Sequence, residues 1–284
     1  MLKPQNLREK YGNWAVVTGG SSGIGLALVR LLASQGVNVF IVALDDALLD
    51  EAQRGVSKQF PTVQIRPIGV NLGDKSENYM KQITEQTDEV DVSILVNNAG
   101  FLVMGFFNEE SIDKYISSLH CNAMAAIRLT HHFYSLMITK KIKGCVMFTS
   151  SAAWFLPAPF ASSYGASKAL LSHFGNSLAI EAQQHGIDVT IFHPSYTHSN
   201  LYRETPKLDV VTFLSKFGWT PEQVAKRMFA CAGRVIVHDM GFYAIATNLL
   251  GRFWDSAFLT TCIIPFRDSM APKKTNSSQN KKTQ

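Results

Sequence analysis

The chain has 284 residues, of which 46% are hydrophobic and 17% are charged, so it can bury a large core and is not generally disordered. This length suits one α/β domain of roughly 250 residues. The formal net charge is +5, but four of the 27 basic residues lie in the last dozen positions, and the remainder is nearly neutral. A basic face of the kind that binds nucleic acid is therefore not expected.

The cysteines and the amino terminus bear on the compartment. The four cysteines have no CxxC pairing; they are Cys121, Cys145, Cys231 and Cys262. This spacing predicts free thiols in a reducing compartment, with neither a disulfide framework nor a structural metal site. The opening MLKPQNLREKYGNW is polar and lacks the apolar stretch of a signal peptide, so we expect the catalytic body to face the cytosol.

Over the first two thirds of the chain, short β-branched runs alternate with longer amphipathic stretches. The expected strands are 14–18, 37–42, 64–70, 92–96, 144–149 and 188–193, and the expected helices are 24–35, 46–59, 74–88, 110–139 and 163–185. Most of these strands are apolar throughout, as strands covered on both faces are. The alternation predicts an α/β fold, a doubly wound parallel β-sheet (Rossmann fold) flanked by helices.

The pattern changes after residue 194. An irregular stretch, 195–219, leads to a helix whose start is marked by Thr220 and Pro221 at the N-cap and N1 positions. An apolar segment, 240–266, and a lysine-rich tail follow. We therefore expect a single catalytic domain over 12–235, an apolar helical extension over 236–268, and a disordered basic tail over 269–284.

A glycine-rich segment, Thr18-Gly19-Gly20-Ser21-Ser22-Gly23-Ile24-Gly25, stands between the first expected strand and the first expected helix. A pyrophosphate can approach such a backbone closely, and the helix start offers free N–H groups and the positive end of its dipole. Gly19 would permit the tight turn, Gly23 the close approach, and Gly25 the packing of helix on strand. A glycine-rich turn alone is weak evidence, but this strand and helix flank it as a dinucleotide site requires.

The TGxxxGxG spacing of this loop resembles the short-chain dehydrogenase/reductase superfamily, and four further segments match over about residues 12–200. They are Asn97-Asn98-Ala99-Gly100 after the fourth strand, Asn122 in a helix, Ser151 at 13 residues before Tyr164, and Tyr164-Gly165-Ala166-Ser167-Lys168 as a YxxxK motif. The resemblance implies a nicotinamide-dependent oxidoreductase whose catalytic residues are Asn122, Ser151, Tyr164 and Lys168. It implies cofactor contacts from Thr18, Gly19, Ser21, Ser22, Gly23, Ile24, Gly25, Asn71, Asn98, Ala99, Gly100, Tyr164, Lys168, Pro194 and Thr197.

The spacing of Tyr164 and Lys168 places both side chains on one face of a helix. A nearby ammonium favours a phenolate, so we expect Lys168 to lower the pKa of Tyr164 from its ordinary value near 10. Tyr164 would donate a proton to a carbonyl oxygen during reduction and take it back during oxidation. The resemblance adds that Lys168 binds the nicotinamide ribose, Ser151 holds the substrate oxygen and Asn122 orders a water.

Each feature also has a plain structural explanation. A tyrosine and a lysine four apart are often a surface pair, and adjacent serines after a strand are often a turn or a cap. Ser150 is the rival of Ser151, and only the family spacing separates them. Histidines at strand ends are usually satisfied polar residues, so neither His193 nor His198 is assigned a role.

The cofactor type is decided poorly by the sequence. The segment Pro194-Ser195-Tyr196-Thr197 departs from the family's PGxVxT, because serine replaces the glycine and threonine replaces the valine. The end of the second strand has neither the acid of NAD enzymes at position 43 nor the arginine of NADP enzymes at position 44. Ser21 favours NADP(H) and Asp45 favours NAD(H). We expect NADP(H), because position 43 is small and uncharged, with NAD(H) as the alternative.

The expected substrate cleft is rich in apolar side chains: Phe101, Met104, Phe106, Phe107, Trp154, Phe155, Leu156, Phe160, Tyr202 and Phe213. This favours an acyl chain, a sterol or another lipid, unless some of these residues line a subunit interface. Members of the superfamily are commonly dimers or tetramers, so we expect a homo-oligomer.

The segment 240–266 is interrupted by Arg252 and Asp255, which leaves apolar runs shorter than the roughly 20 residues that span a bilayer. It could form an interfacial helix pair on a membrane surface or cap the substrate pocket of a soluble protein. The terminal Lys281-Lys282-Thr283-Gln284 resembles the dilysine KKxx retrieval signal of the endoplasmic reticulum, which a lysine-rich tail could also produce by chance.

The opening YGNWAVVTG resembles the microsomal 3-ketoacyl-CoA reductases and 17β-hydroxysteroid dehydrogenases. We therefore expect a reductase of a lipid-like ketone on the cytosolic face of the endoplasmic reticulum membrane. The alternatives are a broad-specificity carbonyl reductase of the cytoplasm, or a catalytically silent cofactor-binding protein.

Overall fold

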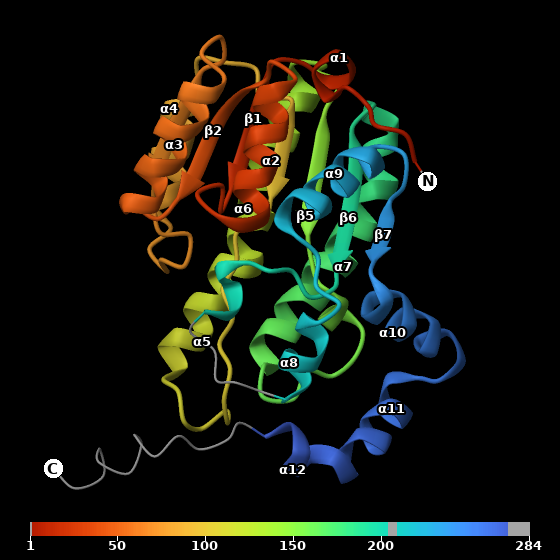
Figure 1. Ribbon diagram of the computed structural model, residues 1–284. Coiled ribbons are helices and arrows are strands. Elements are labelled where there is room, and N and C mark those ends of the chain that lie inside the picture. Colours follow the sequence, from red (N-terminus) through yellow and green to blue (C-terminus); the bar gives the residue numbers. More distant parts are fainter. Residues whose placement is uncertain (1, 204–208, 272–284) are drawn as a thin grey trace, which may run out of the picture.

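The computed structural model describes residues 2–203 and 209–271. Its centre is a seven-stranded parallel sheet in the order β3-β2-β1-β4-β5-β6-β7 (Figure 1). The strands are β1 (Trp14–Thr18), β2 (Asn38–Ala43), β3 (Ile65–Gly69), β4 (Ile94–Asn97), β5 (Cys145–Thr149), β6 (Asp188–Pro194) and β7 (Val237–Met240). The predicted doubly wound Rossmann fold is confirmed.

Helices cover both faces of the sheet and bury one apolar cluster on each. One face carries α2 (Gly23–Ser34), α3 (Ala47–Gln59) and α9 (Pro221–Cys231). The other carries α4 (Asn78–Thr87), α6 (Ala125–Thr139) and α7 (Ser162–Ala182). Because both faces are covered, the central strands are apolar along their whole length. The chain order reverses between β1 and β4, and the carboxyl ends of the strands at such a point form the usual binding crevice of this fold.

Three local features differ from the expected elements. A short helix, α1 (Leu7–Tyr11), precedes the first strand. The helix expected over 110–139 is divided into α5 (Ile112–Leu119), a π-helix (His120–Met124) and α6. The strand β7 lies within the expected extension and pairs with β6 at the sheet edge. Its sequence, VHDM, is short and polar, so it carries almost none of the periodicity that identified the other strands.

The carboxyl-terminal part forms three helices below the sheet in Figure 1: α10 (Phe242–Phe253), α11 (Ser256–Ile263) and α12 (Arg267–Met270). A further short helix, α8 (Asp209–Ser215), lies in the stretch expected to be irregular. Within residues 2–203 and 209–271, no helix is both long and apolar enough to cross a membrane. All four cysteines are free thiols, as their spacing predicted.

Candidate active site

The glycine loop that follows β1 is braced by the end of β4. The Thr18 hydroxyl oxygen accepts hydrogen bonds from the backbone N–H groups of Asn98 (2.9 Å) and Ala99 (3.0 Å). The Asn98 amide donates in return to the Thr18 carbonyl oxygen at 3.1 Å. Gly19 has φ +63°, and a Cβ atom there would lie 2.8 Å from the Cα atom of Ala99. The loop can therefore lie against β4 only because this residue has no side chain.

The start of α2 fits a dinucleotide pyrophosphate. A Cβ atom at Gly25 would collide with the Gly19 carbonyl oxygen and lie 2.7 Å from the Asn98 amide nitrogen. The Ser22 side chain at the N-cap makes no capping hydrogen bond to the described residues. The first N–H groups of this 12-residue helix are thus available to an anion, which the positive end of the helix dipole also favours. Gly23, at φ +53°, completes the turn that exposes them.

The catalytic candidates meet on α7 and on the turn after β5. Tyr164 and Lys168 are both buried on one face of α7. The Lys168 ammonium donates a hydrogen bond to the Thr149 carbonyl oxygen at 2.9 Å and lies 5.6 Å from the centre of the Tyr164 ring. The Ser151 side chain is near enough to the Tyr164 phenol to lower its pKa. The structure thus brings three of the four predicted catalytic residues into one group.

Burial controls the proton affinities in this group. Burial raises the pKa of the Tyr164 phenol, and the hydrogen bond from Ser151 only partly opposes that rise. Burial also lowers the pKa of the Lys168 ammonium to about 8. The expected lowering of the Tyr164 pKa by Lys168 is therefore wrong for this structure. Loss of water around the buried phenol is the largest cause of the rise, and the Lys168 ammonium is not among the groups that lower the pKa of Tyr164.

Asn122 lies in the π-helix between α5 and α6. Its side-chain oxygen accepts from the Phe101 N–H at 2.8 Å, and its amide nitrogen donates to the Phe101 carbonyl oxygen at 2.9 Å. The same nitrogen reaches Ser167 Oγ on α7 at 3.3 Å. The Asn122 side chain thus holds the segment after β4 against α7. Single π turns of this kind are frequent at functional sites.

The two adjacent serines have different environments. Ser150 is buried, and its hydroxyl contacts the Lys168 carbonyl oxygen at 2.9 Å and the Ser172 hydroxyl at 2.8 Å. Ser151 is half-buried, accepts from the Ala153 N–H at 3.1 Å, and its side chain lowers the pKa of the Tyr164 phenol. The geometry therefore agrees with the family spacing, which selected Ser151.

The segment after β6 is held by the carboxyl-terminal part of the chain. Pro194 and Thr197, for which a cofactor contact was predicted, are buried at and just after the carboxyl end of β6. Ser195, which replaces the family glycine, accepts a hydrogen bond from the Ala244 N–H at 3.0 Å and so caps α10. The replacement is accommodated by Gly241, where a Cβ atom would lie 2.7 Å from Ser195 Oγ.

The residues expected near the adenosine are partly committed to other contacts. The Asn71 side-chain oxygen accepts from the Gly73 N–H at 2.9 Å. Asp46 caps α3 by accepting from the N–H groups of Leu48 and Leu49. Asp45 packs against Gly69, where a Cβ atom would lie 2.8 Å from the carboxylate. Ser21 and Ile24 are half-buried in the glycine loop.

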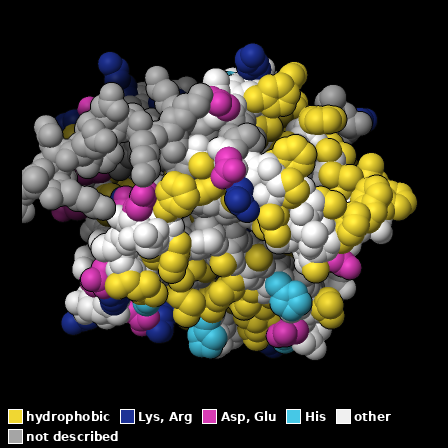
Figure 2. Space-filling view, turned by 90° about the horizontal axis from the view of Figure 1, so that it is seen from below, with side chains coloured by type: hydrophobic (Ala, Val, Ile, Leu, Met, Phe, Trp, Pro, Cys, Tyr) yellow, Lys and Arg dark blue, Asp and Glu magenta, His cyan; other side chains and the backbone are white. Residues whose placement is uncertain are grey.

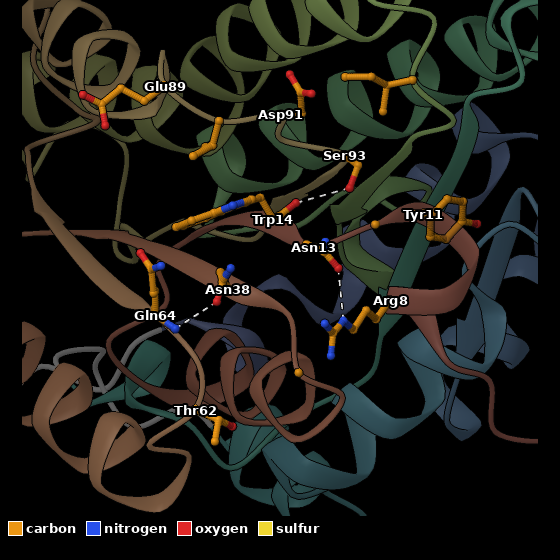
Figure 3. Close-up of a pocket in the computed structure, with 14 residues that line it drawn as sticks. Arg8, Tyr11, Asn13, Trp14, Asn38, Thr62, Gln64, Glu89, Asp91 and Ser93 are labelled. Carbon is orange, nitrogen blue, oxygen red and sulfur yellow. Dashed lines mark hydrogen bonds between the residues drawn. The ribbon is translucent and has the colours of Figure 1, made fainter.

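One large polar cavity lies away from these residues. It has a volume of about 860 Å³ and is lined by residues such as Arg8, Asn13, Asn38 and Ser93 (Figure 3). Asn13 and Ser93 directly precede β1 and β4, and Asn38 begins β2, so the cavity lies at the amino ends of the strands. Ligands of this fold bind at the carboxyl ends, so this cavity is not the active site.

Tyr202 was expected only as one apolar residue of the cleft. Burial raises its pKa, and the neighbouring Tyr164 phenol adds to that increase, so the two phenols are close. The Tyr202 ring stacks on Tyr196 with centroids 4.5 Å apart. Nothing in its local sequence distinguishes Tyr202, because only the folded chain brings it beside Tyr164.

The fold and this site together define a Rossmann-type oxidoreductase that uses NAD(P). Comparison with known proteins agrees: the family described as short chain dehydrogenase matches residues 13–208. The chain belongs to the short-chain dehydrogenase/reductase family, and it acts on CH–OH or C=O groups with NAD(P).

Individual relatives are distant. A very-long-chain 3-oxoacyl-CoA reductase-like protein of Arabidopsis thaliana is 30% identical over 236 residues, which are 82% of this chain and 74% of that protein. The inactive hydroxysteroid dehydrogenase-like protein 1 of Homo sapiens is 31% identical over 69% of this chain and 59% of its own length. The structure of L-sorbose reductase from Gluconobacter frateurii, complexed with NADPH and L-sorbose, has a TM-score of 0.69 and 25% identity. It covers 81% of this chain and 95% of that one.

Proposed function

We propose that Tyr164 is the acid/base of this oxidoreductase, with Ser151, Lys168 and Asn122 as its partners. In reduction, Ser151 holds the carbonyl oxygen beside Tyr164, and the phenol donates its proton to that oxygen. The Lys168 ammonium stabilises the phenolate that remains. When bound, NAD(P) supplies or accepts the hydride. The observation that carries this proposal is the burial of Tyr164 and Lys168 on one face of α7, with the Lys168 ammonium 5.6 Å from the centre of the Tyr164 ring.

Replacement of the phenol tests the assignment. We expect Tyr164→Phe to lower kcat by roughly 10²- to 10⁴-fold on any ketone that the wild type reduces, because only the proton donor is lost. Tyr134→Phe on α6 is the control, since this half-buried phenol lies outside the site and should leave kcat unchanged. Equal rates for Tyr164→Phe and wild type would contradict the proposal.

A catalytically silent protein is the alternative from another class, and the human relative is named as inactive. The burial of Asn122, Tyr164 and Lys168, with Ser151 half-buried at the same turn, favours an active enzyme. A wild-type chain that binds NADPH but turns over no member of a ketone panel would support the silent alternative.

For the cofactor we propose NADP(H) over NAD(H). The end of β2 offers Ala43 rather than an acid, and the Asp46 carboxylate is occupied as the cap of α3. An acid that binds both ribose hydroxyls is the mark of an NAD enzyme, and no such acid stands at position 43. A tenfold higher catalytic efficiency with NADH than with NADPH would reverse this assignment.

For the substrate we propose a ketone with a long apolar chain. An apolar groove of about 610 Å³ begins beside the Ser151 turn, at Ala153 and Trp154, and extends to Ile263 and Met270 on the carboxyl-terminal helices. The plant relative is named after very-long-chain 3-oxoacyl-CoA reduction. We expect kcat/KM to rise with chain length across a series of 3-oxoacyl thioesters. A preference for small soluble ketones would favour the broad-specificity carbonyl reductase.

The groove and the catalytic pair lie on different faces of α7. Ala166 and Ala169 line the groove, and at about 100° per residue they project away from Tyr164. The groove therefore suits the distal part of a chain whose carbonyl lies at Tyr164, rather than the carbonyl itself.

We also propose that the carboxyl-terminal helices rest on the cytosolic face of the endoplasmic reticulum membrane. Figure 2 shows apolar side chains gathered on the face seen from below. Exposed aromatic residues on these helices include Phe242, Phe253, Phe258 and Phe266. Such exposure is typical of a surface that contacts lipid or another chain. The KKTQ terminus and most of the basic tail lie outside the described residues.

We also propose that the chain forms a homo-oligomer, a dimer or a tetramer, because other apolar side chains are exposed as well. Ile112, Leu170 and Ile180 are exposed apolar residues on α5 and α7. Light scattering of the purified chain after size-exclusion chromatography tests this, and a monomer at micromolar concentration would contradict it.

A further inference from the structure

A second buried group of polar side chains lies directly behind the catalytic residues. Asp239 Oδ1 on β7 is 2.7 Å from His193 Nδ1 on β6. His193 Nε2 is 2.9 Å from Ser172 Oγ on α7, which is 2.8 Å from Ser150 Oγ. The Ser150 hydroxyl reaches the carbonyl oxygen of Lys168 at 2.9 Å. An unbroken chain of hydrogen bonds thus runs from a carboxylate on β7 to the backbone of Lys168.

We infer that Asp239 and His193 are positioning residues, which act through Ser172 and Ser150 to hold Ser151 and Lys168 in their catalytic arrangement. This inference rests on the roles proposed above for Ser151 and Lys168. Ser150 is the direct neighbour of Ser151 in the chain, and it bonds the backbone of Lys168, so one side chain joins the two catalytic segments.

The direction of the hydrogen bonds is set at Asp239. A carboxylate can only accept, so His193 Nδ1 carries a proton, and Nε2 of the neutral ring is then an acceptor. The Ser172 hydroxyl lies 2.9 Å from Nε2 and also 2.9 Å from the Lys168 carbonyl oxygen, so it reaches the Lys168 backbone directly as well as through Ser150. Each hydroxyl has only one proton, so a change at Asp239 propagates along the whole chain.

Two other segments contact the pair formed by His193 and Asp239. The indole ring of Trp154, just after Ser151, stacks on the His193 ring with centroids 5.1 Å apart and planes at 23°. The Asn248 amide on α10 donates to Asp239 Oδ2 at 2.6 Å. The pair therefore joins the carboxyl-terminal helices to the catalytic turn, and a shift of either would move the other.

Burial distinguishes this group from a surface network. The side chain of His193 is fully buried, and that of Asp239 is 18% exposed. Ser150 and Ser172 are also buried. Hydrogen bonds in such surroundings are costly to leave unmade, so the group has one preferred arrangement. That property is what a positioning network needs.

Asp239→Asn is the first test, because it preserves shape and changes only the pattern of donors and acceptors. If the new amide turns its oxygen to His193, its NH₂ group faces the NH₂ group of Asn248. If it turns its NH₂ group to His193, the proton of the ring must move to Nε2, which reverses the chain. The first arrangement disturbs the contact with Asn248 on α10, and the second disturbs the chain that leads to Ser150.

We expect Asp239→Asn to lower kcat by about 10- to 100-fold, as small misplacements of reacting groups do, while the KM for the cofactor stays within about twofold. The primary isotope effect with deuterated NADPH should rise, because hydride transfer becomes the slow step. Ser172→Ala removes one link with a smaller change of structure, and it carries the test if Asp239→Asn does not fold. Thr190→Val, a buried hydroxyl elsewhere on β6, is the matched control and should leave kcat unchanged.

A double variant separates positioning from a general loss of stability. If the chain acts as a unit, Asp239→Asn combined with Ser150→Ala should cost no more in kcat than the worse single variant. Losses of kcat that multiply in the double variant would overturn the inference. An unchanged kcat in both Asp239→Asn and Ser172→Ala, measured at a temperature where both are folded, would overturn it as well. Every assay uses a ketone on which wild type is active and Tyr164→Phe is not, so failure here leaves the proposed function intact.

Discussion

The Lys168 ammonium lies 5.6 Å from the centre of the Tyr164 ring, and both side chains are buried in the same face of α7. In water this pair would consist of a neutral phenol and a fully charged amine. In the protein, burial raises the pKa of Tyr164 and lowers that of Lys168 to about 8. The site therefore favours a protonated tyrosine beside a lysine that loses its charge easily.

The first prediction concerns pH. Because its pKa is raised, Tyr164 stays protonated at neutral pH and can donate a proton to a carbonyl oxygen. Oxidation of an alcohol instead requires the deprotonated phenol, which accepts the proton of the alcohol. We expect kcat/KM for oxidation to rise between pH 7 and pH 10, while kcat/KM for reduction falls only on the alkaline side. The hydrogen bond from Ser151 lowers the phenol pKa, so Ser151→Ala should move the oxidation limb to higher pH. An oxidation rate independent of pH would contradict this reading.

The second prediction concerns the stability cost of the buried lysine. A shift of the Lys168 pKa from 10.5 to about 8 means that the charged form costs the fold roughly 3 kcal/mol below pH 8. Lys168→Met removes this cost but also the hydrogen bond to Thr149, so we expect a net gain of roughly 2 kcal/mol in urea unfolding at pH 7. Turnover should be lost at the same time.

The sign of the effect follows from proton binding. Between pH 8 and pH 10.5 the unfolded chain binds more protons at Lys168 than the folded chain does. Wild-type stability from this residue thus rises with pH, and the advantage of Lys168→Met disappears before pH 10.5, where only the loss of the hydrogen bond to Thr149 remains. Lys140→Met, at an exposed ion pair with Asp91, is the control and should show no comparable gain. A less stable Lys168→Met at pH 7 would refute the prediction.

The third prediction concerns the glycine loop. In Gly25→Ala the new methyl group would collide with the Gly19 carbonyl oxygen, so the loop and the start of α2 must separate. We expect the Kd for NADPH, measured by fluorescence titration, to rise by about tenfold or more. Gly55→Ala in α3 is the control, because a Cβ atom there meets no atom within 4 Å. That control should bind NADPH normally and unfold at slightly higher temperature.

The fourth prediction concerns membrane contact. Phe253 and Phe266 are 72% and 64% exposed, and burial of such a ring in lipid contributes roughly 1.5–3 kcal/mol. We expect Phe253→Ser combined with Phe266→Ser to lower co-sedimentation with vesicles of phosphatidylcholine and phosphatidylserine by tenfold or more. The control is Ile180→Ser, which changes an exposed apolar residue near the carboxyl end of α7. This variant should bind the vesicles as well as wild type does. Equal binding by the double variant and wild type would argue for a capped pocket instead.

The sequence by itself determined the fold and most of the candidate site. Apolar runs such as those at β1 and β6 indicate strands that are buried on both faces. The glycines at 19, 23 and 25 indicate a backbone that lies close to a pyrophosphate or to a neighbouring strand. Tyr164 and Lys168 could be paired because helical spacing is a local property. Signals of this kind depend on residues within a few positions of one another, so they can be read without the folded chain.

Only the tertiary structure decided the properties that depend on residues far apart in sequence. It placed Ser151 rather than Ser150 against Tyr164, and it reversed the expected direction of the Tyr164 pKa, because the surrounding burial comes from several elements. It joined His193 to Asp239, which lie 46 positions apart, and it added β7 to the sheet although its four residues show little periodicity. Desolvation and hydrogen-bond partners are set by packing, and packing is not encoded in any one short stretch of residues.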